Sequence, residues 1–290
     1  MNQEERRQRR QKDTKSAVIV CVAAVLILLL LAAGGVFLVG RLLPKGGGQS
    51  AGADATELPG ENVATTEEQT EQPQTEVQTD PVEEQAAQLV SQMTLEDKIA
   101  QMFVITPNAL TGYASGVTAA GDTTKEAYQS RPVGGIVYMA DNLTDPEQTT
   151  TMLSNMQEIA RERTGLPVFL CVDEEGGSVA RIAGNEAFGV TNVGNMSDIG
   201  ASGDVQNAYN AGTTIGSYLA ALGFNVDFAP VADVLTNPDN QVIGQRSFGS
   251  DAQTVAGMVT SELQGLSAAG VYGTVKHFPG HGGTAGDSHD

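Results

Sequence analysis

The hydrophobic and polar positions divide the chain into four stretches, and the second of them is strongly apolar. Residues 17–40 contain no charged side chain and consist mainly of Val, Leu, Ile and Ala. At about 1.5 Å per residue, such a run forms a helix roughly 36 Å long, enough to cross a hydrocarbon core about 30 Å thick. We therefore predict a transmembrane helix over 17–40. A secretory signal peptide is the alternative, but its apolar region usually spans only about 7–15 residues.

The polar residues on either side of this run predict its orientation. Residues 1–16 are basic, and such a flank favours a cytoplasmic amino terminus. Residues 41–84 are rich in Gly, Gln, Thr, Glu and Pro and have almost no large apolar side chain, so they bury too little surface to fold. We expect a single-pass protein of the cell membrane, in which a disordered acidic linker tethers an extracellular domain.

From residue 85 onwards the pattern is that of a globular domain, 85–290, in which strands alternate with helices. The predicted strands are short apolar runs at 103–106, 133–139, 167–172, 225–234 and 271–275. The predicted helices carry apolar residues at helical spacing and cover 86–93, 94–102, 146–164, 205–222 and 252–269. Strands that are apolar on both faces and alternate with helices are typical of a parallel sheet covered by helices.

Two α/β folds fit this pattern. Polar groups recur at the carboxyl ends of the predicted strands, as they do at the active-site rim of a barrel enzyme. About five strands are recognisable in roughly 200 residues, fewer than the eight strands and about 250 residues of a (β/α)8 barrel. The pattern therefore leaves open an incomplete TIM-type barrel and an open doubly wound sheet.

Composition excludes one class of partner and one kind of crosslink. The net charge is −19, and the globular part has no cluster of Lys and Arg with which to contact phosphates, so we expect no nucleic-acid binding. The two cysteines, Cys21 and Cys171, fall in the apolar run and in a predicted core strand, so we expect no disulfide. Cys171 is interpreted as a small buried hydrophobe.

The glycine-rich segment after the last predicted strand carries the richest chemistry, including all three histidines. Asp287 and His289 are two residues apart, so an extended backbone points both side chains the same way. A carboxylate beside an imidazole fixes its tautomer and stabilises the protonated ring, which gives a general acid and base near neutral pH. A surface loop with an accidental Asp and His is the alternative.

The same segment also offers a weaker indication of a metal site. His277 and His281 have the spacing of a zinc-binding histidine pair. Pro279 and the neighbouring glycines prevent the helix that would put both rings on one face, so we expect no metal and no cofactor. Lys276 and His277, adjacent at the strand end, can instead donate to hydroxyls or to an anion.

Charged residues also follow the strand at 167–172. Asp173 is followed by Glu174 and Glu175, and three carboxylates at a strand end are costly unless they face water or a cation. Arg181 could supply that cation; an exposed acidic turn is the alternative. Arg246 lies in a loop between a strand and a helix, and its planar guanidinium suits bidentate recognition of a carboxylate or of sugar hydroxyls.

Four segments, in chain order, carry a family resemblance: VDEEGGSVARI, GFNVDFAPVADV, RSFG and KHFPGHGGTAGDSHD. Over residues 85–290 the sequence resembles the amino-terminal catalytic domain of glycoside hydrolase family 3, in the branch of the β-N-acetylglucosaminidases. The resemblance implies a (β/α)8-type barrel that needs no cofactor and hydrolyses terminal β-linked N-acetylhexosamine with retention, from a glycan or muropeptide-like substrate. It implies His289 as the acid/base with Asp287 as its partner, and sugar binding by Asp173, Arg181, Arg246, Lys276 and His277.

One departure from the family concerns the nucleophile. Retaining hydrolysis needs a second carboxyl group about 5 Å from the acid/base, and in the family this Asp follows a later strand. No acid within residues 1–290 occupies that place, so we expect a fragment that is inactive by itself, although its parent is an enzyme. The alternatives are a non-catalytic carbohydrate-binding relative and a metal-dependent barrel hydrolase that uses the histidines.

Overall fold

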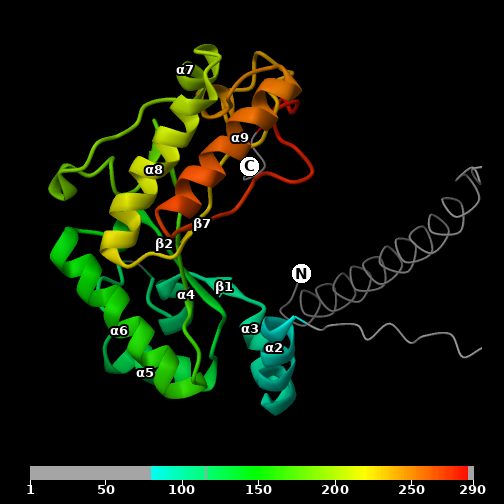
Figure 1. Cartoon of the computed structure of the whole chain (residues 1–290). Coiled ribbons are helices and arrows are strands. Elements are labelled where there is room, and N and C mark those ends of the chain that lie inside the picture. The colour runs from blue at the N-terminus through cyan, green and yellow to red at the C-terminus, as the bar shows by residue number, and fades with distance from the viewer. Residues whose placement is uncertain (1–79, 115, 287–290) are drawn as a thin grey trace, which may run out of the picture. The chain divides into compact units, whose positions relative to one another are not determined.

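The computed structural model describes residues 80–114 and 116–286, which belong to one compact unit, Thr75–Asp290 (Figure 1). The predicted cytoplasmic tail and membrane span, and most of the predicted linker, lie outside these residues. No helix within the described ranges has both the length and the apolar character to cross a bilayer. The first of them, α2 (Pro81–Gln92), begins inside the stretch predicted to be linker. Asp80 caps it by accepting a hydrogen bond from the Val82 N–H, and Pro81 suits its first turn.

A parallel sheet forms the centre of the domain, which confirms the predicted α/β class (Figure 1). Its described strands are β1 (Val104–Ile105), β2 (Gly135–Tyr138), β3 (Phe169–Val172), β6 (Val226–Asp227) and β7 (Tyr272–Gly273). Each pairs in parallel with the next, in the order β1-β2-β3-β6-β7. A doubly wound sheet reverses its strand order at a switch point, and the described strands contain no such reversal.

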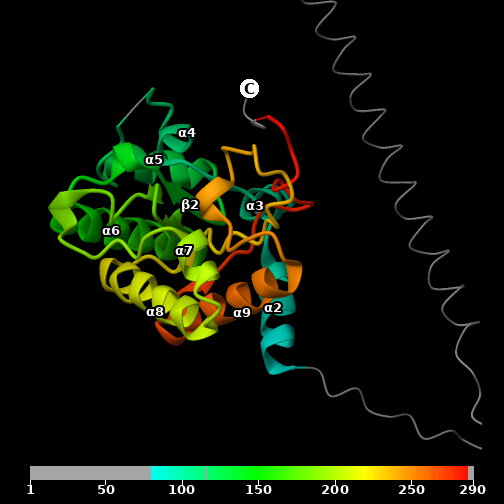
Figure 2. The same ribbon diagram turned by 90° about the horizontal axis from the view of Figure 1, so that it is seen from above.

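Helices connect these strands, and Figures 1 and 2 show α6, α8 and α9 following one another along the sheet. The helices after α2 are α3 (Leu95–Gln101), α4 (Pro107–Thr111), α5 (Asp122–Ser130), α6 (Pro146–Thr164), α7 (Met196–Ala201), α8 (Val205–Leu222) and α9 (Ala252–Ala268). Short 3-10 helices cover Ala140–Asn142, Glu186–Phe188 and Gly244–Arg246. A small antiparallel hairpin, β4 (Glu174–Gly176) and β5 (Val179–Ala180), follows β3 directly. All five predicted helices are present; α4, α5, α7 and the hairpin are additional.

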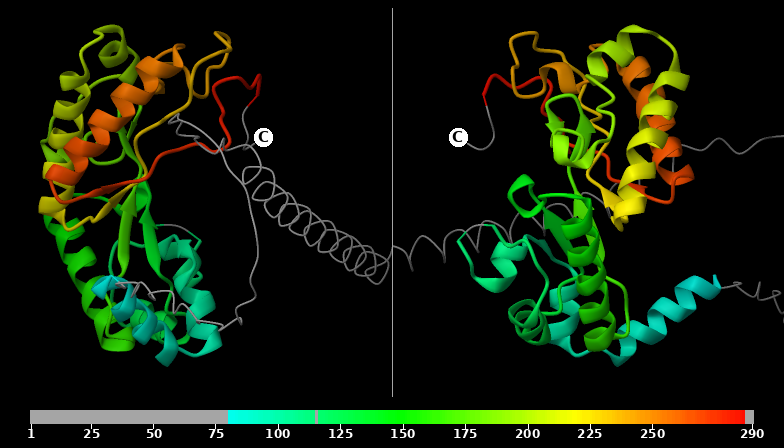
Figure 3. Two further views of the ribbon diagram at one scale, coloured as in Figure 1. Left: turned by 45° about the vertical axis from the view of Figure 1, so that its right-hand side comes forward. Right: turned by 90° about the vertical axis from the view of Figure 1, so that its left-hand side faces the viewer.

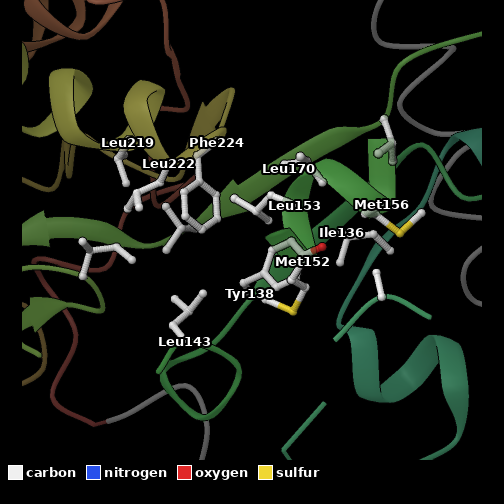
Figure 4. Close-up of a cluster of buried hydrophobic side chains, with 14 of the residues drawn as sticks. Ile136, Tyr138, Leu143, Met152, Leu153, Met156, Leu170, Leu219, Leu222 and Phe224 are labelled. Carbon is white, nitrogen blue, oxygen red and sulfur yellow. The ribbon is translucent and has the colours of Figure 1, made fainter. Parts of the chain in front are cut away.

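The main hydrophobic core lies between the sheet and the helices α6 and α8 (Figure 4). Strand β2 is buried along its whole length, as its apolar run predicts. Tyr138 of this strand packs edge-to-face on Phe224, with ring centroids 5.9 Å apart. Cys171 in β3 is a buried free thiol whose pKa burial raises to about 12, so its interpretation as a small core residue is confirmed.

Helices α8 and α9 pack side by side (Figure 3), and glycines lie where they touch. A Cβ atom at Gly265 of α9 would collide with the carbonyl oxygen of Tyr209 in α8. A Cβ at Gly212 of α8 would in turn collide with the carbonyl oxygen of Glu262 in α9. Small residues therefore let the two backbones touch, and this contact supports the strands that carry the site residues described next.

Candidate active site

The carboxyl ends of β3, β6 and β7 bring together polar side chains that are far apart in the sequence. Asp173 follows β3, Asp233 lies beyond β6, and Lys276 and His277 lie beyond β7. Val231 and Lys276 form an isolated parallel bridge, which continues the pairing of these two strands as far as the site. Parallel strands end at a common edge, and this edge is where barrel and open α/β enzymes place their chemistry.

Lys276 is the cation at the centre of this edge. Its Nζ lies 2.6 Å from Asp173 Oδ1 and 2.5 Å from Glu175 Oε1. The Glu175 side chain is only 2% exposed, and those of Lys276 and Asp173 are 16% and 21% exposed. A buried carboxylate is stable only when a partner compensates its charge. Lys276 therefore compensates the charges of two strand-end carboxylates, one of which is almost fully buried.

Arg246 supplies the second cation and binds Glu175 through both arms of its guanidinium. Its Nε lies 2.8 Å from Glu175 Oε2 and its Nη2 2.9 Å from Glu175 Oε1. This hydrogen bonding to Glu175 raises the pKa of Arg246 above its ordinary value. The two guanidinium donors of Arg246 that were expected to bind a carboxylate or sugar hydroxyls thus bind Glu175 of the protein itself. Sequence analysis assigned no role to Glu175; its only signal was a carboxylate directly after a buried strand.

The His277 ring is held by a partner at each nitrogen. Its Nδ1 lies 2.6 Å from Asp233 Oδ2, and its Nε2 lies 3.3 Å from Nη2 of Arg246. Since a guanidinium can only donate, Nε2 accepts and the neutral ring carries its proton on Nδ1, which donates to Asp233. Asp233, whose side chain is fully buried, was noted in the sequence only as a polar group near a strand end.

The glycine-rich segment after His277 is fastened to the loop that follows β6. Asn240 donates from Nδ2 to the carbonyl oxygen of His281 at 2.7 Å, and Asn237 donates to that of Thr284 at 2.9 Å. Asp233 accepts a hydrogen bond from the backbone N–H of His281. Two asparagines and one aspartate therefore fix the course of the chain immediately before the predicted dyad.

A pocket of about 450 Å³ opens between these two segments. Asp233, Lys276 and His277 line it, together with Thr236, Phe278 and several glycines. Its volume lies within the range of about 300–1,000 Å³ that is usual for small-molecule sites. It is large enough for a single sugar ring and presents both hydrogen-bonding groups and an apolar surface.

Three further acids lie beneath this edge and are fully buried: Glu174, Asp227 and Glu262. Burial raises the pKa of Asp227 well above its ordinary value and that of Glu262 to about 8. Neither oxygen of Glu262 has a hydrogen-bond partner in the described part of the chain, and Oδ2 of Asp227 also lacks one. Asp227 and Glu262 therefore differ from Asp173 and Glu175, whose charges are matched by Lys276.

The comparison with protein families decides the family. The model of the glycosyl hydrolase family 3 N-terminal domain matches residues 94–290. This chain belongs to glycosyl hydrolase family 3. The family match includes every predicted catalytic and sugar-binding residue, and it confirms the resemblance seen in the sequence motifs.

Curated members of glycosyl hydrolase family 3 that are similar to this chain carry the name beta-hexosaminidase. Beta-hexosaminidase A of Pseudoalteromonas piscicida is 41% identical over 162 residues, which are 54% of this chain and 26% of that protein. Beta-hexosaminidase LpqI of Mycobacterium tuberculosis is 37% identical over 194 residues, 67% of this chain and 45% of that protein. The matches thus span between about a quarter and about half of these relatives' lengths.

Two solved structures are similar to this chain in fold and in sequence. A β-N-acetylglucosaminidase from Paenibacillus sp. str. FPU-7 aligns with a TM-score of 0.60 and 42% identity, over 68% of this chain and 35% of that one. A β-N-acetylhexosaminidase from Beutenbergia cavernae aligns with a TM-score of 0.57 and 30% identity, over 66% of this chain and 55% of that one. The fold of the described domain is therefore that of the family.

Within the family 3 domain, the predicted site residues have different outcomes. Asp173, Arg246, Lys276 and His277 lie in one connected network, whereas Asp287 and His289 fall outside the described residues. The expectation that Arg181 neutralises the acidic run is wrong, because Lys276 and Arg246 do so. Nε of Arg181 is buried and has no hydrogen-bond partner among the residues that the structure describes.

The geometry also bears on the alternative of a zinc site at the two histidines. His277 and His281 lie near each other, with ring centroids 6.1 Å apart. Both nitrogens of His277 are engaged by Asp233 and Arg246, and Nδ1 of His281 lies 2.6 Å from Oγ1 of Thr284. A metal bound to His277 would have to displace Asp233 or Arg246, whereas Nε2 of His281 is buried and has no hydrogen-bond partner among the described residues. Across residues 80–114 and 116–286, no group of three or more His, Cys, Asp or Glu side chains is arranged to hold a metal.

Proposed function

We propose that this chain contributes the sugar-binding edge and the acid/base of a retaining β-N-acetylhexosaminidase, which releases terminal β-linked N-acetylhexosamine from glycans such as cell-wall muropeptides. His289 acts as the acid/base and Asp287 as its partner, while Asp173, Arg181, Arg246, Lys276 and His277 bind the sugar. The observation that carries the proposal is the network that joins the carboxyl ends of β3, β6 and β7 in a family 3 domain.

We further propose that the domain has the architecture of a (β/α)8 barrel. The strands of such a barrel follow one another in sequence order, and right-handed crossovers then place all helices outside. The described strands have this order. Because a doubly wound sheet would need a reversal of strand order, the arrangement supports a barrel over that alternative.

The acids of the site support glycoside hydrolysis. The carboxylates of Asp173, Glu175 and Asp233 lie together at one edge of the sheet, where Lys276, Arg246 and His277 pair with them. Hydrolysis of a glycoside passes through a positively charged, oxocarbenium-like transition state, which carboxylates close to the sugar stabilise.

The direct test is turnover by the gene product, meaning residues 1–290 together with any sequence encoded after them. We expect release of nitrophenol from its β-N-acetylglucosaminide and not from its β-glucoside, with the β-anomer as the first sugar product in NMR spectra. Sugar binding without turnover would identify the non-catalytic alternative. Activity that is lost with a chelator would identify the metal-dependent one, and absence of both binding and turnover would refute the proposal.

The role of His289 is tested with leaving groups of different quality. Replacement His289→Ala should reduce hydrolysis of a poor leaving group, such as a second sugar, by about 100–10,000-fold, because general acid catalysis contributes this much. A nitrophenyl leaving group needs little protonation, so its hydrolysis should fall far less. Equal losses for both substrates would contradict the assignment of His289 as the acid/base, but not the assignment of the sugar-binding residues.

We also propose that residues 17–40 anchor the protein in the cell membrane, with residues 1–16 in the cytoplasm and the domain outside. The uncharged run and its basic flank support this. The protein should remain with membranes after extraction at alkaline pH, and protease added to intact cells should remove the domain. Release by alkali, or protection from the protease, would contradict the anchor or its orientation.

A further inference from the structure

Glu174 lies between two members of the network but points to a different set of partners. Its carboxylate accepts hydrogen bonds from the backbone N–H groups of Ile182 and Ala183 and from the hydroxyl of Tyr218, each at 2.8 Å. The side chain is fully buried. All three donors are neutral, so the charge of Glu174 is compensated by dipoles and not by Lys276, unlike that of Asp173.

These contacts connect four parts of the domain. Glu174 is the first residue of β4, and its own N–H donates to Oδ1 of Asp227 in β6 at 3.0 Å. Its carboxylate reaches across the hairpin to the chain just beyond β5, and Tyr218 brings in α8. The two amides that it holds belong to the residues directly after Arg181.

A carboxylate is required for this arrangement. Its two oxygens accept the three hydrogen bonds, with Oε2 facing Ile182 N–H and Oε1 facing both Ala183 N–H and Tyr218 O–H. A glutamine has one acceptor oxygen, and its NH₂ group would then face one of these donors. An alanine would leave all three donors buried without an acceptor, which is costly.

We propose that Glu174 is a positioning residue for sugar binding, which fixes Arg181 at the edge of the site by holding the two backbone amides that follow it. The inference depends on the proposed function, in which Arg181 binds the sugar, and it assigns a role to an acid that is fully buried and whose carboxylate is engaged by donors of the protein. A binding group that is held in its bound position before the substrate arrives gives higher affinity than a mobile one, so an acid outside the pocket can influence KM.

The test measures kcat and KM of the gene product for nitrophenyl β-N-acetylglucosaminide. Glu174→Ala should raise KM by about tenfold or more and change kcat much less, since the reacting groups are untouched. Glu174→Gln should restore part of the loss, and Tyr218→Phe, which removes one donor, should have a small effect of the same kind. The matched control is Glu186→Gln, an exposed acid of the segment that follows, which should behave as the wild type.

A double substitution separates positioning from a general structural effect. In an Arg181→Ala background, Glu174→Ala should raise KM by much less than it does alone, because both changes remove the same contact. Independent, multiplicative effects would overturn the inference, as would an unchanged KM in Glu174→Ala. If Glu174→Ala does not fold, the KM values of Glu174→Gln and Tyr218→Phe, each measured with and without Arg181→Ala, test the inference in the same way. An active wild type with insensitive variants refutes this inference alone, whereas a wild type without turnover or sugar binding refutes the proposed function, and the inference with it.

Discussion

Replacing Glu262 should change how the stability of the domain depends on pH. This residue of α9 is fully buried, and neither of its oxygens has a hydrogen-bond partner in the described residues. Burial first, and the charge of Glu175 second, raise its pKa from 4.5 to about 8. We predict that Glu262→Gln becomes progressively more stable relative to the wild type as pH rises between these two values.

The direction and the size of this pH dependence follow from proton linkage. The folded wild type keeps the proton on Glu262 up to about pH 8, whereas the unfolded chain releases it near pH 4.5. Unfolding therefore releases a proton between these values, so the wild type loses stability with rising pH until the folded pKa is passed. At about 1.36 kcal/mol per pH unit, the full loss is roughly 5 kcal/mol. Glutamine does not titrate and has no such loss.

Urea unfolding followed by circular dichroism measures the effect, since the chain has no tryptophan to serve as a fluorescent probe. The free energy of unfolding of each protein is determined at about pH 5 and about pH 8, and the change in their difference is compared with the expected few kcal/mol. Asp227 also titrates in both proteins, and because Glu262 is one of the groups that raise its pKa, the measured difference includes this coupling. Glu158→Gln, at an exposed position of α6, is the control. A Glu262→Gln difference that stays constant with pH would refute the reasoning.

Three further predictions concern other parts of the domain. Gly265→Ala should destabilise it by about 1–3 kcal/mol in urea unfolding, because the new methyl group meets the carbonyl oxygen of Tyr209; an unchanged midpoint would show that α8 and α9 can separate. Cys171 should resist thiol reagents in the folded protein and react in urea, as mass spectrometry of its peptide can show, since its thiol is buried with a pKa of about 12. Asp173→Ala should raise KM by about 10–100-fold, because the loss of a hydrogen bond to a charged partner is large; an unchanged KM would remove it from the sugar-binding set.

Much of the fold could be predicted because local signals mark its elements. Helix α6 begins and ends where the sequence indicates: Asp145 caps its start by accepting from the Gln148 N–H, and Gly165 ends it at a φ of 73°. The parallel class follows from strands that are apolar on both faces. Helix α5 was missed because only Thr124 and Tyr128 of its nine residues are buried, which leaves too little apolar periodicity to detect.

The site was less predictable because its contacts join distant segments. The hairpin strand β4 consists of two buried glutamates and a glycine, a composition that local patterns associate with an exposed turn. The charge of Glu175 in this strand is compensated by Arg246, 71 residues away, and by Lys276, which also pairs with Asp173, 103 residues away from it. Nearness in the chain suggested Arg181 instead. Only the packing of the parallel strands brings the true partners together.

The alternation of acids and bases along the strand ends restricts how this edge can vary. Asp173 pairs with Lys276, Lys276 with Glu175, and Glu175 with Arg246; His277 and Asp233 extend the series. Removal of Glu175, for example, leaves the guanidinium of Arg246, whose side chain is only 18% exposed, without its carboxylate partner. Substitutions at this edge, whether natural or designed, should therefore occur in pairs, so that a change in one charged residue is accompanied by a compensating change in its partner.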